Sequence, residues 1–264
     1  MRISIITPNF NGERFLAATI ESVLAQRADG VDVEYIVIDG GSTDGSHAIL
    51  EHYKDAIDTV VIEPDNGPAS AINKGLKLAK GDVLAWLNAD DCYHTGTLAR
   101  VADCLSANPQ RALGFGRCRI VNEAGDEIRH AITRFKELFF PLSCRFTIQS
   151  INYISQPAMF FRRSALEQAG LLREDMQAAW DYEFILRLWR QGGAVRIEGS
   201  PPLADFRWHE GSISGQTYAT QFREEYQAAV ADAGRLSPQA CLHAGVRLGI
   251  VGIYHLMARQ RQRQ

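Results

Sequence analysis

Acidic and amide side chains follow an apolar run of the sequence at a spacing that suits cation binding. The run 83–87 ends at Asn88, Asp90 and Asp91. Asn88 and Asp90 are two positions apart, so in an extended segment they face the same side. Asp and Asn oxygens suit Mg²⁺ or Mn²⁺, and such cations are commonly held by one or two carboxylates together with substrate phosphates.

Similar polar groups follow other apolar runs, but each acid also has a plain structural explanation. Asp39 is a candidate turn former, and Asp44 and Asp91 are candidate caps of the helices that follow them. Several acids gathered at one edge repel one another unless they share a cation or face hydrogen-bond donors. The pattern as a whole therefore favours a binding site.

The sequence lacks the usual glycine-rich loops that bind phosphate. The first strand-to-helix turn, at 7–12, reads TPNFNG and does not match the Gly-x-Gly-x-x-Gly of dinucleotide-binding folds, and no Walker-type loop is present. A metal ion would therefore carry more of the charge neutralisation of any phosphorylated ligand.

The elements that must position these residues alternate between strands and helices. Buried strands are predicted from apolar runs at 3–7, 33–38, 59–62 and 83–87. Helices are predicted at 11–26, 46–53, 69–79 and 95–107. Apolar strands separated by helices indicate an α/β fold with a mostly parallel sheet covered on both faces, whose ligands bind beyond the carboxyl ends of the strands.

The pattern changes in the second half of the chain. Strands are predicted at 113–121, 127–132, 194–197 and 203–208, and helices at 164–169 and 182–191; the aromatic, basic stretch 134–151 has no clear period. The tail from 216 to 259 is mostly helical in pattern. We predict one α/β domain over 1–215 and a C-terminal helical extension over 216–264.

The composition narrows the classes of function. A net charge of -3 argues against a nucleic acid partner. The N-terminal apolar run is too short for a signal peptide, and no stretch reaches the length of a membrane-spanning helix. The cysteines form no Cys-x-x-Cys pair, which indicates reduced thiols and a cytoplasmic protein: Cys92, Cys104, Cys118, Cys144 and Cys241.

Three segments of the sequence have a characteristic order and spacing: TPNFN at 7–11, IVIDGGSTDG at 36–45 and LNADD at 87–91. Together they resemble family 2 glycosyltransferases of the GT-A fold, closely over 1–95 and more loosely to 215. The resemblance implies a Rossmann-like sheet and an inverting transfer from a nucleoside-diphosphate sugar, usually UDP-linked, to a hydroxyl acceptor. Residues 1–95 would bind the donor and 96–215 the acceptor.

The same resemblance assigns donor contacts. It implies that Thr7, Pro8 and Asn11 lie against the nucleotide, that Asp39 accepts a hydrogen bond from the base, and that Asp44 belongs to the same loop. The segments 64–67 and 73–75 resemble a family segment beside the nucleotide, which adds Asp65 and Asn73 as contacts.

Asn88-Ala89-Asp90 takes the place of the Asp-x-Asp motif of the family. The resemblance makes Asp90 the direct ligand of Mn²⁺ or Mg²⁺, leaves Asn88 for the ribose or donor sugar, and lets Asp91 orient the donor or a metal-bound water. It also implies that a late histidine, His209, reaches the metal or the diphosphate, with Arg207 as an alternative phosphate partner.

Transfer to a hydroxyl needs a general base. The segment 177–184, QAAWDYEF, resembles the acidic motif of the family and makes Asp181 the base, with Glu183 as the alternative. Asp181 also suits a helix N-cap. Trp180 stands where the family usually has Glu, which leaves the type of acceptor open.

Two rival functions remain at this point: a nucleotidyltransferase that makes nucleotide sugars, and a non-catalytic nucleotide-sugar-binding protein. The first usually needs a glycine-rich, basic first loop, and the second would lack the base. The run 242–257 predicts a helix that packs on the domain or, alternatively, lies on the inner membrane surface near a lipid-linked acceptor. The family resemblance implies synthesis of cell-surface polysaccharide or glycolipid.

Overall fold

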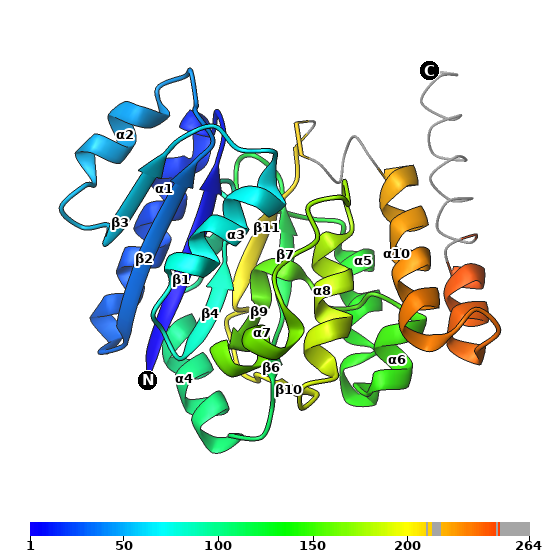
Figure 1. The fold of residues 1–264 in the computed structure, drawn as a ribbon. Helices are drawn as coiled ribbons and strands as arrows, with labels where there is room; N and C mark the ends of the chain where they lie inside the picture. The colour runs from blue at the N-terminus through cyan, green and yellow to red at the C-terminus, as the bar shows by residue number, and fades with distance from the viewer. Residues whose placement is uncertain (210, 213–217, 247, 249–264) are drawn as a thin grey trace.

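The computed structural model describes residues 1–209, 211–212, 218–246 and 248 (Figure 1). Among these residues, seven strands form a central sheet in the order β10-β6-β9-β4-β1-β2-β3. Its strands are β1 (Arg2–Asn9), β2 (Asp32–Asp39), β3 (Thr59–Ile62), β4 (Val83–Trp86), β6 (Leu113–Phe115), β9 (Met159–Arg162) and β10 (Ala194–Arg196). Strand β9 is antiparallel to β4 and β6, and the other pairs are parallel.

Helices cover both faces of this sheet, because alternate residues of its strands point to opposite sides. Ile3 and Ile5 pack in one apolar layer with α1 and α4, and Ile6 packs in the other with α3, α7 and α8. The helices are α1 (Glu13–Leu24), the 3₁₀ helix η1 (Ala25–Asp29), α2 (Ser46–His52), α3 (Pro68–Leu78), α4 (Thr97–Ala107), α7 (Arg163–Ala169) and α8 (Trp180–Trp189).

Helix α3 lies directly against β1 because its contact residue is a glycine. A Cβ atom at Gly75 would meet Cγ2 of Ile6 at 2.4 Å. Any larger side chain at this position would push the helix away from the sheet.

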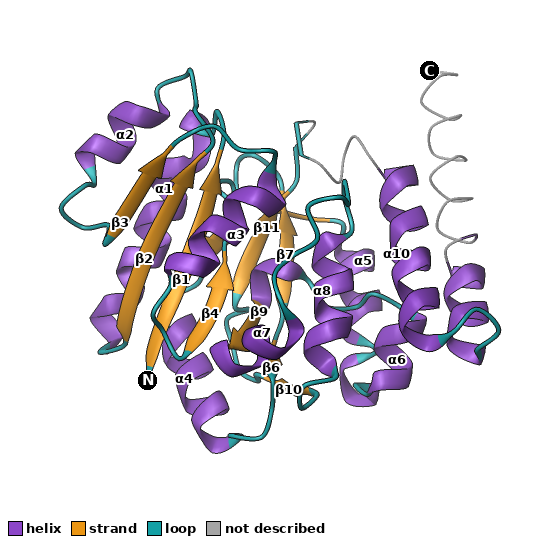
Figure 2. Cartoon of the chain, viewed as in Figure 1, coloured by secondary structure: helices purple, strands orange, loops and turns teal. Residues whose placement is uncertain are grey.

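A smaller, four-stranded sheet joins the two halves of the described chain, in the order β5-β11-β7-β8 (Figure 2). Its strands are β5 (Cys92–Tyr93), β11 (Ala204–Arg207), β7 (Cys118–Val121) and β8 (Glu127–Ile128). Strand β5 comes directly after the Asp90-Asp91 loop, and it pairs with β11, which leads to His209. Residues more than a hundred positions apart are thereby brought together.

The remaining elements gather beside α8. They are α5 (His130–Glu137), η2 (Phe140–Leu142), α6 (Arg145–Ser150), η3 (Gln156–Ala158) and α10 (Tyr218–Ala233), and residues 238–246 are also helical. Helix α10 packs against α8 and α6. In the described part of the chain, no helix is both long and apolar enough to cross a membrane.

The predicted α/β fold with a mostly parallel central sheet flanked by helices is confirmed. The strand predicted at 113–121 was wrong: it divides into β6 and β7, which belong to different sheets, because Gly116 instead donates its N–H to Ala158. The strand predicted at 127–132 ends at Ile128, where Arg129, with a φ of 54°, leads into α5. The predicted domain boundary at 215 falls within 213–217, outside the described residues, and stays a prediction.

The stretch 134–151, which has no clear period in sequence, contains the end of α5, together with η2 and α6. Of the helix predicted at 242–257, residues 242–246 are helical, and residues 249–257 lie outside the described part of the chain.

Candidate active site

Asp90 and His209 lie side by side at the ends of β4 and β11. Nε2 of His209 is 2.9 Å from Oδ2 of Asp90, and both side chains are partly exposed. The hydrogen bond to Asp90 raises the pKa of His209 above its ordinary value. The structure therefore brings together the two residues that the sequence predicted as metal ligands.

Asp91 turns the other way, into the protein. It is fully buried, and its carboxyl group accepts hydrogen bonds from the backbone N–H of Arg207 and from Nδ2 of Asn88. Burial, reinforced by the charge of Asp90, raises the pKa of Asp91 well above its usual range. The alternative role of Asp91 as a cap of the next helix was wrong, because α4 starts at Thr97 and Gly96 is its N-cap.

Asn88 is connected through Gln156 to the segment that leads into β9. The Nδ2 of Asn88 lies 3.4 Å from Oε1 of Gln156, and Nε2 of Gln156 donates to the carbonyl of Trp86 at 2.7 Å. Asn88 is partly exposed beside Asp90, so it retains surface for a ligand.

Phe15 of α1 packs beneath the Asp90–His209 pair. Its ring centroid is 5.5 Å from that of His209, and the guanidinium groups of Arg14 and Arg207 lie 4.9 and 4.8 Å from it. Arg14 is also paired with the Glu123 carboxylate at 2.6 Å, and Arg207 donates to the backbone carbonyls of Asp90, Asn122 and Glu123, so both guanidinium groups are held in place beside the pair.

Asp39 holds the loop after β2 together. Its oxygens accept hydrogen bonds from Asn9 Nδ2, the Ser42 hydroxyl and the backbone N–H groups of Gly41 and Ser42, and Nε2 of His47 lies 3.2 Å away. Although burial opposes ionisation, these hydrogen bonds hold the pKa of Asp39 below its usual value. The carboxylate has no exposed surface, and the predicted contact of Asp39 with the base stays a prediction.

The other predicted nucleotide contacts at this edge are partly structural. Thr7 and Pro8 are buried, and the Thr7 hydroxyl lies 3.0 Å from the Tyr35 hydroxyl. Asn11 is exposed and accepts the N–H of Thr43, whereas Asp44 accepts the N–H groups of Glu13 and Ser46. Asp44 therefore stabilises the beginnings of α1 and α2.

Asp65 lies over the end of β2. A Cβ atom at Gly40 would come within 2.6 Å of Oδ2 of Asp65, so only glycine leaves room for this approach. Oδ1 of Asp65 accepts the N–H of Gly67, and the side chain is partly exposed. Asn73 is buried instead, and its amide binds the backbone of Leu172 and the carboxylate of Glu174.

Asp181 is the second residue of α8 and is half-buried. Burial raises the pKa of its carboxyl group. It accepts the N–H of Tyr182, but the N-cap position belongs to Ala179. The alternative base, Glu183, is paired with Arg187 at 2.8 Å.

The residues 4–170 match the model of a family described as Glycosyl transferase family 2. The chain belongs to this family. It is 35% identical over 188 residues to an uncharacterized glycosyltransferase of Mycobacterium tuberculosis, covering 70% of this chain and 68% of the relative. It is also 28% identical over 247 residues to the uncharacterized glycosyltransferase EpsJ of Bacillus subtilis, covering 87% and 69%.

Two solved glycosyltransferase structures have a similar fold. TarS residues 1–349 of S. aureus, in complex with UDP-GlcNAc, superposes with a TM-score of 0.70 at 17% identity and covers 90% of this chain and 68% of its own. The mannosyltransferase PcManGT of Pyrobaculum calidifontis, in complex with GDP-Man and Mn²⁺, gives 0.66 at 17%, covering 99% and 79%. The chain is thus a glycosyltransferase with the predicted GT-A fold.

The side chains of Asp90 and His209 suit a divalent cation that is also coordinated by the substrate. Among the described residues, no three His, Cys, Asp or Glu side chains are grouped as metal ligands. Asp90 and His209 offer one carboxylate oxygen and one imidazole nitrogen. Mn²⁺ and Mg²⁺ complete such sets with water and phosphate oxygens.

The segment that leads to Asp181 is held by a residue of α10 that no sequence motif marks. The N–H groups of residues 177–179 all donate to the carboxylate of Glu224. Glu224 and its neighbour Glu225 lie in a helical stretch more than forty positions from Asp181, and no motif or spacing connects them to it.

Proposed function

We propose that this protein is an inverting glycosyltransferase that moves a sugar from a UDP-sugar to a hydroxyl group of a saccharide or lipid-linked saccharide. The observation that carries the proposal is the position of Asp181, a partly buried carboxyl group in the first turn of α8, whose neighbour Trp180 packs against Trp86 at the end of β4. Inversion follows from a single displacement, in which the acceptor oxygen attacks the anomeric carbon from the side opposite the diphosphate.

Asp181 would act as the general base. A carboxyl group with a raised pKa is a stronger proton acceptor than an exposed Asp, and that favours removal of a proton from a hydroxyl in the transition state. Glu183 suits this role less, because its carboxylate is paired with Arg187.

Asp90 and His209 would hold a divalent cation, Mn²⁺ or Mg²⁺, together with the donor diphosphate. When bound, the cation would neutralise charge that develops on the leaving diphosphate. Arg207, whose guanidinium group packs on Phe15, would face the same diphosphate.

The nucleotide would lie across the carboxyl ends of β1, β2 and β3. Because Asp39 is buried and Asp65 is partly exposed over Gly40, we assign the contact with uracil to Asp65. Asn11 and Asn88 have exposed surface on either side of this edge, and we assign them to the nucleotide and to the ribose or sugar.

A product assay tests the proposal. The purified protein is incubated with a panel of nucleotide sugars and Mn²⁺, the panel having been ranked by thermal shift, since a ligand that binds the folded state raises the melting temperature. We expect release of nucleoside diphosphate from one donor, which is UDP-linked. Release of pyrophosphate would support a nucleotidyltransferase instead, and tight binding without turnover would support a non-catalytic binding protein.

A further inference from the structure

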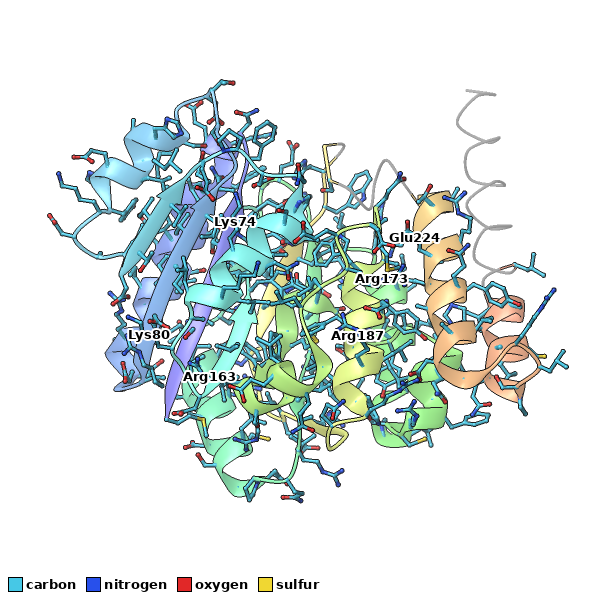
Figure 3. The ribbon with its side chains drawn as sticks, viewed as in Figure 1. Lys74, Lys80, Arg163, Arg173, Arg187 and Glu224 are labelled. Carbon is cyan, nitrogen blue, oxygen red and sulfur yellow. The ribbon has the colours of Figure 1, made fainter. Side chains whose placement is uncertain are left out.

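Helix α10 supplies the cap of the helix that carries Asp181. Oε1 of Glu224 accepts the N–H of Gln177 at 3.0 Å, and Oε2 accepts those of Ala178 and Ala179 at 2.9 and 3.0 Å. Figure 3 labels Glu224 on the side of α10 that faces α8. The pKa of Glu224 is held below its usual value by these hydrogen bonds, which outweigh the effect of burial.

Glu224 and Asp181 satisfy different N–H groups at the start of α8: Glu224 accepts those of residues 177–179, and Asp181 accepts that of Tyr182. The first N–H groups of a helix need acceptors, which are usually side chains at the N-cap, but Ala179 has none to offer. Glu224 therefore fixes the three residues that lead into α8 from outside the helix. Asp181 follows Ala179 by two residues, in the first turn of α8, and its carboxylate accepts the N–H of Tyr182.

The neighbouring residue, Glu225, brings a second carboxyl group to the same place. It is 5% exposed, and its Oε1 accepts hydrogen bonds from Asn152 at 3.1 Å and Gln221 at 3.2 Å. Burial, together with the nearby charge of Asp181, raises the pKa of Glu225 to about 7.

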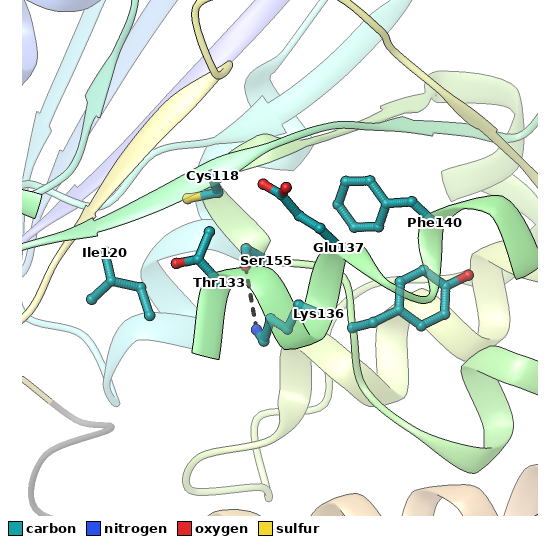
Figure 4. A pocket seen from close by; sticks show the side chains of 8 residues that line it. Cys118, Ile120, Thr133, Lys136, Glu137, Phe140 and Ser155 are labelled. Atoms are coloured by element: carbon teal, nitrogen blue, oxygen red, sulfur yellow. Dashed lines mark hydrogen bonds between the residues drawn. The ribbon is translucent and has the colours of Figure 1, made fainter. Parts of the chain in front are cut away.

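The positive charge of Lys136 in α5 acts on both Asp181 and Glu225. Its charge lowers the pKa of Asp181 and of Glu225, and its Nζ donates to the Ser155 hydroxyl at 3.3 Å. Figure 4 shows this lysine at the wall of a cavity of about 10 Å³. Lys136 and Glu225 thus add charge to the surroundings of α8, and the Tyr182 hydroxyl donates to the carbonyl of Ile148.

We propose that Glu224 of α10 is a positioning residue for Asp181, because its carboxylate holds in place the three residues that lead into α8. The proposal rests on the assignment of Asp181 as the base. It makes α10, which lies beyond the predicted boundary at 215, part of the catalytic unit.

The test measures kcat, KM and the Kd for UDP of the Glu224→Gln variant. We expect kcat to fall about 10- to 100-fold, because displacement of a catalytic group by about an ångström has effects of this size. The Kd for UDP should stay within about twofold of wild type, since the donor side is untouched. Gln227→Ala, an exposed position on the same helix, is the matched control and should behave as wild type.

A loss of folding in Glu224→Gln would be seen as a lower melting temperature, and Glu224→Asp, which keeps the charge, should then recover both stability and part of kcat. A folded Glu224→Gln variant with wild-type kcat would overturn the positioning role of Glu224.

A variant at Asp181 separates failure of this inference from failure of the proposed function. If Asp181→Asn abolishes transfer while Glu224→Gln behaves as wild type, the base assignment stands and the inference is wrong. If Asp181→Asn retains normal transfer, the base assignment itself is wrong.

Discussion

The indole rings of Trp86 and Trp180 pack against each other, with their centroids 5.7 Å apart. Trp86 ends β4, four residues before Asp90, and Trp180 immediately precedes Asp181. This contact therefore connects the strand that leads to the proposed cation site with the helix that carries the proposed base. Phe184 also packs on Trp86, at 6.1 Å.

Replacing Trp86 with Ala should destabilise the protein by about 3–5 kcal/mol, because the indole is fully buried and its removal leaves a cavity. Urea unfolding would measure the change. The milder Trp86→Phe variant should fold but have a lower kcat, because the smaller ring holds β4 and α8 less firmly against each other. Phe146→Ala, at an exposed position, should have little effect on either quantity. Equal losses of unfolding free energy in Phe146→Ala and Trp86→Ala would contradict a specific role of the buried indole.

Asp39 should stabilise the protein in a pH-dependent way. Because its folded pKa lies below the unfolded value of about 3.9, its contribution is present above that pH and is lost as pH falls through the folded pKa. Asp39→Asn should cost about 1–3 kcal/mol near neutral pH. The unfolding free energies of wild type and variant should converge in acid, whereas the exposed Asp55→Asn control should follow the wild type throughout.

Much of the fold and part of the site could be predicted from the sequence. The alternation of apolar strands with amphipathic helices predicted the parallel part of the sheet, because that signal is local. Asp90 and His209, far apart in sequence, were predicted as metal ligands from the resemblance to family motifs. The structure places Nε2 of His209 2.9 Å from Oδ2 of Asp90.

Other features depend on packing that no local pattern records. The burial of Asp39 depends on Asn9 from the adjacent strand, and the capping of α8 depends on Glu224 from another helix. The short strands β5 and β8 have two residues each, too few to show a period.

His209→Ala should weaken Mn²⁺ binding in the presence of UDP by about 10- to 100-fold, since losses of this size follow removal of groups that support a metal. Calorimetric titration measures the affinity directly, without turnover. His94→Ala is a matched control, because His94 is also 2.9 Å from an Asp, namely Asp205, in the smaller sheet. Equal affinities in the His209 variant and wild type would remove His209 from the cation site. We also expect EDTA to suppress transfer and Mn²⁺ to restore it.

Asp65→Asn should weaken UDP binding by about tenfold, the effect of losing one hydrogen bond that involves a charged acceptor. Glu63→Gln, an exposed acid of the same loop, should leave the affinity unchanged. Fluorescence or calorimetric titration with UDP would measure both. Unchanged UDP affinity in the Asp65 variant would mean that another group contacts the base.

The most direct test of the account is the transfer activity of Asp181→Asn, measured beside its affinity for the donor. Asn keeps the size of the side chain but accepts a proton very poorly, so we expect transfer to fall by at least about a hundredfold, in line with the contribution of a general base. Donor affinity and melting temperature should remain close to wild type. Normal transfer by this variant would contradict the assignment of Asp181 as the base and, with it, the proposed mechanism.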